Sequence, residues 1–149
     1  MDLMFGDFLK RLTQPDPAPL ADSDARLALT ALLVRVARSD NDYATSEARL
    51  IEEIAATRYG LDAAQARDLR SQGEALEREA PDTVRFTRAI KEAVAYEDRL
   101  AVIEALWQVV LADGTRSDEE NALLRLVANL LGVTDTDSHT ARQRVAQSS

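Results

Sequence analysis

Two stretches of the chain are apolar on nearly every side of a helix, which is the pattern of a buried central helix. The first lies within residues 23–39 and the second runs from Leu100 to Ala112. Further helical patterns are predicted at residues 45–59, at 63–79, from Asp82 or Thr83 onward, at 118–131 and, as a short polar helix that frays, at 138–147. No stretch of useful length alternates apolar and polar residues with the two-residue period of a β-strand. The sequence therefore predicts an all-α single domain of about seven helices.

Each of the two apolar stretches begins one copy of a repeated pattern. Residues 31–61 and 104–133 align when Asp40 is placed on Asp113. Each copy has an apolar run, an Asp, a turn residue, a Glu seven positions after the Asp, an apolar pair and a closing glycine. We expect an internal pseudo-repeat of helix, acidic turn and helix, related by an approximate two-fold axis. Its shared core is predicted to contain Leu32, Val36, Leu106, Trp107, Val110, Leu124 and Val127.

The acidic residues of this repeat are candidate metal ligands. Asp40 and Asp113 are expected at the C-terminal ends of helices, where the helix dipole disfavours negative charge. Glu47 and Glu120 are expected in the first turns of the next helices, so each hairpin folds an Asp back toward its own Glu. Carboxylate and main-chain oxygens suit Ca²⁺ or Mg²⁺. Asp42 and Asp118 are expected to support this site.

A purely structural interpretation of the same residues stays open. Asp-Asn and Asp-Gly form turns readily, and Ser117 with Glu120 makes a capping-box pattern. The spacing from Asp to Glu is too short for an EF-hand loop, so that class of calcium site is excluded. His139 is the sole histidine, and Trp107 is expected to pack in the core.

The motifs A-D-G-x4-[DE]-E at Ala112–Glu120 and S-D-N-x5-E at Ser39–Glu47 resemble the TerB family of tellurite-resistance proteins. The resemblance is closer to the stand-alone TerB-like proteins of bacteria and covers roughly residues 20–133. It implies an all-helical, non-catalytic protein of the stress response, in the cytoplasm or at the inner membrane. A metal-binding acidic face carries over to Asp40, Glu47, Asp113 and Glu120. A related domain is attached to J-domain co-chaperones, which implies protein partners.

Residues 1–20 are expected to form an N-terminal unit ahead of the helical domain at 21–149. Residues 2–13 are predicted to form an amphipathic helix with the apolar stripe Met4, Phe5, Phe8, Leu9 and Leu12. Pro15, Pro17 and Pro19 predict an extended connector after it. The stripe has three interpretations: packing on the domain, binding of a protein partner, or peripheral binding to a membrane surface. The membrane is least favoured because Lys10 and Arg11 are offset by Asp2 and Asp7.

Composition narrows the function classes. The net charge of −8 disfavours nucleic acids and anionic lipids as partners, and it favours cations and basic proteins. The lack of cysteine excludes disulfides and thiolate metal sites and fits a cytoplasmic protein. No stretch is apolar enough for a transmembrane helix. Charged runs at Glu74–Glu79 and Glu97–Arg99 are interpreted as solvated helix faces.

The leading hypothesis is a non-enzymatic, TerB-like stress-response module that binds a divalent cation or a basic partner through its two acidic turns. The alternative is a co-chaperone-like adaptor that recruits proteins or a second copy of itself and has no metal role. An enzyme is not expected, because no nucleophile or nucleotide-binding motif accompanies the carboxylates.

Overall fold

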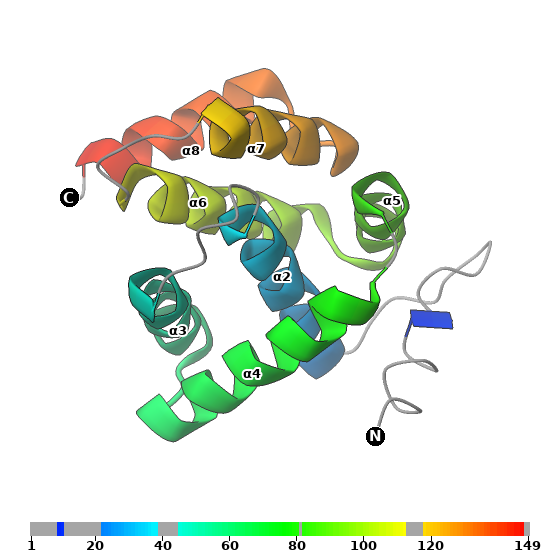
Figure 1. Ribbon diagram of the computed structural model, residues 1–149. Coiled ribbons are helices and arrows are strands. Elements are labelled where there is room, and N and C mark those ends of the chain that lie inside the picture. The colour runs from blue at the N-terminus through cyan, green and yellow to red at the C-terminus, as the bar shows by residue number, and fades with distance from the viewer. Residues whose placement is uncertain (1–8, 11–21, 39–44, 81, 113–117, 148–149) are drawn as a thin grey trace.

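The computed structural model describes residues 9–10, 22–38, 45–80, 82–112 and 118–147. These residues contain seven long helices and no strand, which confirms the all-α single domain. In chain order the helices are α2 (Asp22–Ala37), α3 (Thr45–Tyr59), α4 (Ala63–Glu79), α5 (Thr83–Ala93), α6 (Tyr96–Ala112), α7 (Asp118–Leu130) and α8 (Asp135–Gln147) (Figure 1). None of these helices is long and apolar enough to cross a membrane.

Helices α2 and α6 are the two central helices, as their apolar pattern predicts. Helix α2 contacts α3, α4, α6 and α7, and α6 contacts α3, α7 and α8 as well. In Figure 1, α4 crosses in front of α2, and α7 and α8 lie along α6. Every residue from Ala28 to Val34 is buried. All seven predicted core residues are buried in one continuous cluster, so the predicted core is confirmed.

The two closing glycines end their helices in the same way. Gly60 and Gly132 adopt left-handed φ angles of 64° and 73°, which a glycine reaches without a Cβ clash. The N–H of the following residue then donates to a carbonyl five positions back, at 3.1 Å after Gly60 and 2.9 Å after Gly132. This is the hydrogen-bond pattern of a Schellman cap. The glycines therefore end α3 and α7 with one shared geometry.

The two helices that follow these glycines are also capped in the same way at their N-terminal ends. Asp62 accepts a hydrogen bond from the backbone N–H of Gln65 at 2.8 Å, and Thr134 accepts one from that of Asp137 at 3.1 Å. Helix α4 then packs back on α2, and α8 packs back on α6. Both copies thus continue into a third helix that covers the first.

The helix bounds agree with the proposed repeat. When Asp40 is aligned with Asp113, the first residue of α3, Thr45, falls on the first residue of α7, Asp118. Ile51 and Leu124 are equivalent in the same alignment, and both are fully buried. The two-fold axis itself stays a prediction.

The structure corrects the prediction of a fraying C-terminal helix. Helix α8 begins at Asp135 and buries Ser138, Ala141 and Val145. The indole N–H of Trp107 donates to the Ser138 hydroxyl at 3.2 Å, which ties α8 to α6. The sequence prediction was wrong because α8 is attached through polar as well as apolar side chains. Trp107 itself is a core residue, as expected.

Two charged runs are exposed in part, as predicted: Arg78, Glu79, Glu97 and Asp98 are exposed, but Glu77 and Arg99 are not. The Glu77 side chain is only 14% exposed and pairs with Arg35 at 3.2 Å and with Arg38 at 3.1 Å. Arg99 donates to the backbone carbonyls of Val94 and Leu131. These side chains link α4 to α2 and α6 to the end of α7, so they are structural.

The N-terminal unit lies almost wholly outside the described residues. Leu9 and Lys10 are helical, and Leu9 is partly buried against the core cluster. The remaining stripe residues, Met4, Phe5, Phe8 and Leu12, and the prolines of the connector lie outside the part of the chain that the structure describes.

Candidate functional site

The acidic turns predicted as a metal site fall mostly outside the described residues. Asp40, Asp42 and Asp113 are among the undescribed positions. Asp118 and Glu120 belong to the first turn of α7, but their side chains are not described. Glu47 is described: it lies in the first turn of α3, as predicted, and is partly buried. The ligand set as a whole therefore stays a prediction.

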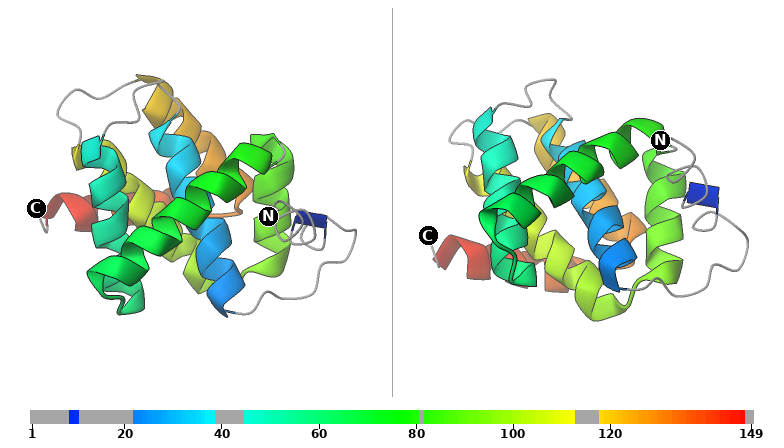
Figure 2. Two further views of the ribbon diagram at one scale, coloured as in Figure 1. Left: turned by 60° about the horizontal axis from the view of Figure 1, so that its bottom comes forward. Right: turned by 90° about the horizontal axis from the view of Figure 1, so that it is seen from below.

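The helix ends that flank the two turns lie on one side of the molecule. These are the C-terminal ends of α2 and α6 and the N-terminal ends of α3 and α7, and they gather at the upper left in both views of Figure 2. Contacts of α2 with α7 and of α3 with α6 agree with this arrangement. The helix ends that border two segments far apart in the sequence thus lie at the same end of the fold.

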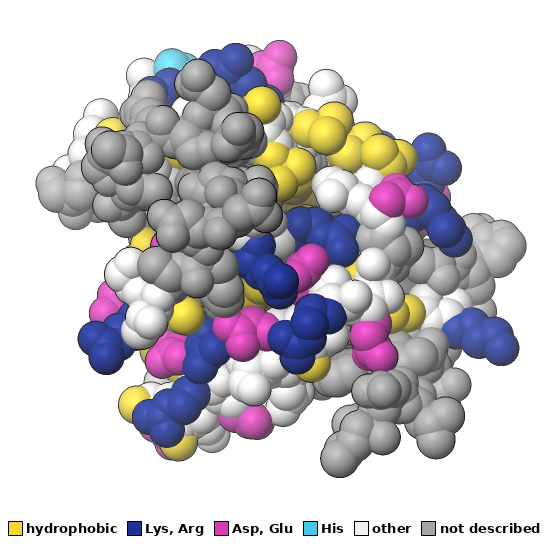
Figure 3. Space-filling view, viewed as in Figure 1, with side chains coloured by type: hydrophobic (Ala, Val, Ile, Leu, Met, Phe, Trp, Pro, Cys, Tyr) yellow, Lys and Arg dark blue, Asp and Glu magenta, His cyan; other side chains and the backbone are white. Residues whose placement is uncertain are grey.

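Most of the net negative charge belongs to these two segments. Residues 39–47 and 113–120 carry seven acidic residues and one arginine, a net charge of −6 out of −8 for the whole chain. On the described surface, by contrast, acidic and basic side chains are interspersed, as the face in Figure 3 shows. For example, Arg70 pairs with Glu52 at 2.5 Å and with Glu74 at 2.8 Å. The excess of carboxylates is therefore local.

Within the described residues, no group of three or more acidic, histidine or cysteine side chains is placed to hold a metal ion. His139, on α8, is exposed.

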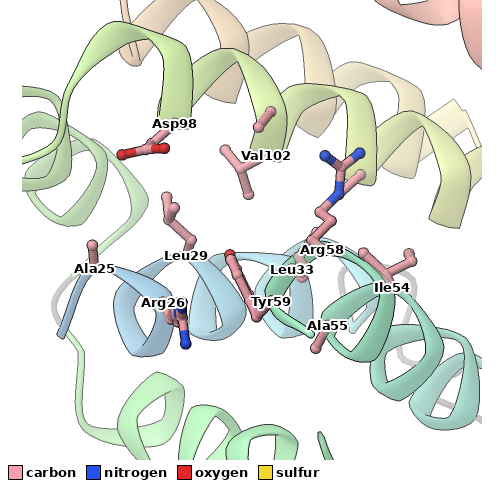
Figure 4. A pocket seen from close by; sticks show the side chains of 12 residues that line it. Ala25, Arg26, Leu29, Leu33, Ile54, Ala55, Arg58, Tyr59, Asp98 and Val102 are labelled. Atoms are coloured by element: carbon pink, nitrogen blue, oxygen red, sulfur yellow. The ribbon is translucent and has the colours of Figure 1, made fainter. Parts of the chain in front are cut away.

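A cavity of about 260 Å³ opens between α2, α3 and α6. Its described walls are mainly apolar, and Figure 4 shows Leu29, Leu33, Ile54 and Val102 around the same space. Four polar side chains also line it: Arg26, Arg58, Tyr59 and Asp98. In Figure 4, Arg58 reaches from α3 toward α6, and Asp98 lies near the opposite end of the cavity.

The polar groups of the cavity act on one another. The Arg26 guanidinium lies 4.8 Å from the centre of the Tyr59 ring, a cation–π contact. Burial raises the pKa of the Tyr59 hydroxyl above its ordinary value; the charges of Arg58 and Arg26 oppose the rise, and Asp98 adds to it. Tyr59 therefore stays protonated at neutral pH and is available as a hydrogen-bond donor.

Arg58 is only partly satisfied. Its Nη2 donates to Gln108 at 3.3 Å and pairs with Glu104 at 3.5 Å. Its Nε is buried and finds no acceptor among the described residues. A buried N–H without an acceptor costs free energy, and most such groups in folded proteins have a partner. Because Arg58 lines the cavity, an acceptor bound there beside its side chain would give this atom a partner.

Comparison with protein families gives a match. The model of the family described as tellurite resistance protein TerB matches residues 26–143 of the 149. The chain belongs to the TerB family. The TerB match begins in α2 and ends in α8, so it spans both copies of the repeat and both acidic segments. Comparison with curated proteins and with solved structures gives no match.

Sequence reasoning anticipated the TerB family but not the cavity. Asp98 belongs to a run interpreted as a solvated face, and Arg58 precedes the aromatic Tyr59 at the end of a helix without a distinctive motif. The one usable signal was a bulky Tyr at the residue before a capping glycine, where the second copy has Leu131. The cavity arises where three helices meet, and spacing along one helix does not reveal it.

Proposed function

We propose that this TerB family member is a non-enzymatic stress-response module whose two acidic turns together bind a divalent cation. The observation that carries the proposal is the local charge: a net −6 in two segments whose flanking helix ends meet on one side of the fold. Carboxylates crowded together repel one another, and a bound cation relieves that repulsion.

The proposed ligands are Asp40, Glu47, Asp113 and Glu120, with Asp42 and Asp118 in support. All of them offer oxygen, which suits Ca²⁺ or Mg²⁺ rather than a thiolate-seeking metal. Glu47 and Glu120 lie in first helical turns, so their backbones are anchored by α3 and α7. A cytoplasmic place for the protein is part of the same proposal.

The test is thermal and chemical unfolding with and without Ca²⁺, Mg²⁺, Mn²⁺ and Zn²⁺, each compared with NaCl at equal ionic strength. A cation present at about 100 times its dissociation constant should stabilise the fold by about 2.7 kcal/mol. NaCl alone should do much less, because screening does not replace coordination.

A charge-matched pair of variants separates coordination from general electrostatics. D40N/D113N should abolish the specific stabilisation by the cation. E92Q/E97Q removes two exposed carboxylates of α5 and α6 and should leave it intact. Melting temperatures indifferent to millimolar Ca²⁺ and Mg²⁺, with no heat of binding, would leave turn formation and helix capping as the role of these residues.

The second candidate function is an adaptor that binds a basic protein, another protein partner or a second copy of the chain without metal. It is favoured by two large apolar side chains on neighbouring helices, Val84 on α5 and Leu126 on α7, which are 42% and 45% exposed. Figure 3 shows apolar side chains gathered along α7 on this face. Concentration-dependent sedimentation that V84S/L126S abolishes, without any cation effect, would favour this adaptor.

A further inference from the structure

The cavity between α2, α3 and α6 has the features of a ligand site that neither the family match nor the acidic turns explain. It combines a mainly apolar wall with a few polar groups, which is the usual make-up of a small-molecule site. The groups lie on three helices, so the site depends on the folded domain. It is also built entirely from described residues that are separate from the proposed metal ligands.

We propose that this cavity binds a small carboxylate with an apolar tail. The carboxylate would accept hydrogen bonds from the buried Nε of Arg58 and from the hydroxyl of Tyr59. The tail would lie against Leu29, Leu33 and Val102.

The charged side chains around the cavity favour an anionic ligand and determine which end of the cavity its carboxylate occupies. Arg26 and Arg58 line the cavity together with one carboxylate, Asp98; Glu104 pairs with Arg58 Nη2 at 3.5 Å but does not line the cavity. Because Asp98 lies toward the end away from Arg58 in Figure 4, it repels a carboxylate and leaves the Arg58 end as the favoured position. The Nε of Arg58 has no acceptor among the described residues, so a bound carboxylate would supply one.

Volume limits the size of the ligand. A cavity of about 150 Å³ holds a benzene molecule, so the 260 Å³ available here suits roughly ten non-hydrogen atoms. Octanoate has that size. The acyl chains of membrane lipids are longer, so the size favours a free carboxylate over a lipid taken from a membrane.

The experiment is titration of the full-length protein with butanoate, hexanoate, octanoate and hexadecanoate, followed by ¹H–¹⁵N NMR and calorimetry. Octan-1-ol and octylammonium serve as probes of the same length with a neutral or a positive head. We expect octanoate to bind best, to shift the amide signals of α2, α3 and α6 around the cavity, and to bind at least about tenfold more tightly than octan-1-ol. Equal binding of octylammonium, or affinity that keeps rising to hexadecanoate, would overturn the proposal.

Two variants test the position of the ligand. Arg58→Gln removes the charge and the Nε donor, and it should weaken octanoate binding about tenfold or more. Ala101→Leu narrows the cavity without touching a polar group and should also weaken it. Ala56→Leu is the matched control, because Ala56 is partly buried on α3 and does not line the cavity. Octanoate binding that survives Ala101→Leu unchanged, or that is lost equally in Ala56→Leu, would show that the carboxylate does not bind here.

Discussion

Gly73 is a position where α4 packs closely on α2, and replacing it by alanine should destabilise the fold. A Cβ at Gly73 would lie 2.8 Å from Thr30 Cγ2 and 3.3 Å from the backbone nitrogen of Ala31. Thr30 is not free to turn away, since it is 1% exposed and its hydroxyl donates to the carbonyl of Arg26 at 2.7 Å. Helix α4 would therefore have to move away from α2.

Two opposing terms decide the magnitude. Alanine is a better helix former than glycine by about 1 kcal/mol, which favours the variant. An extra carbon forced into a packed interface costs about 1–3 kcal/mol. Because part of the contact is to backbone, we expect the clash to win and the free energy of unfolding to fall by about 1–2 kcal/mol.

Urea unfolding followed by circular dichroism measures this change through the midpoint at an unchanged m-value. Thr30→Ser removes the nearest carbon, so the double variant T30S/G73A should show a favourable coupling energy of about 1 kcal/mol. Gly60→Ala is the control: nothing lies within 4 Å of its Cβ, and its cost of about 1–2 kcal/mol comes from the left-handed backbone alone, so T30S should not relieve it. A stabilised G73A protein, or a coupling near zero, would refute the close packing of α4 on α2.

Three further predictions concern stability. Leu106→Ala should lower the free energy of unfolding by about 2–5 kcal/mol in urea titrations, since Leu106 is fully buried; a loss well below that would mean that Leu106 is not a core residue. Burial raises the pKa of Tyr59, and a hydrogen bond to Asp137 raises that of Tyr96. The stability that these neutral tyrosines contribute should therefore be fully present below pH ~10 and be lost as the pH rises above it. Y59F should lose less free energy of unfolding between about pH 9 and 11 than the parent protein, and equal losses would contradict the shift at Tyr59. Deleting residues 1–14 should cost more than about 1 kcal/mol because Leu9 packs against the core; unchanged melting and oligomeric state would instead identify a free recruitment arm.

The sequence was sufficient to predict the helix bounds where strong capping residues mark them. Helices α3 and α4 have the predicted bounds because Gly60 and Asp62 end one and begin the next with local hydrogen bonds. Helix α6 was predicted from Leu100 but begins at Tyr96, since its first turn is polar and carries Glu97 and Asp98. The all-round apolar pattern correctly identified both central helices because no local feature competes with burial there.

The sequence could not predict the contacts of polar side chains whose partners are far away along the chain. Glu77 and Arg99 are residue types that usually lie on the surface. Their partners, Arg35 and Leu131, are 42 and 32 positions away in the sequence. Periodicity describes one helix at a time and is silent on such pairs. The cavity lacked a motif for the same reason. The acidic turns, in contrast, were visible in the sequence because repetition marked them.

The structure adds a contact that supports the repeat independently of the acidic motif. The alignment that places Asp40 on Asp113 also places Arg26 on Arg99. Arg26 lies over the ring of Tyr59, the residue before the first capping glycine, and Arg99 donates to the carbonyl of Leu131, the residue before the second. In both copies an arginine of the first helix thus reaches the end of the second.

The same comparison explains how the copies differ. Leu131 is fully buried, and its own backbone carbonyl accepts a hydrogen bond from Arg99, so an apolar side chain and a main-chain hydrogen bond close that corner. Tyr59 is only partly buried, Arg26 lies on its ring, and the cavity opens next to it. The two helix pairs thus differ at this corner, and only the first places Tyr59 and Arg58 beside the cavity. The proposed cation site and the proposed carboxylate site are therefore separable by mutation, because the first depends on what the copies share and the second on where they diverge.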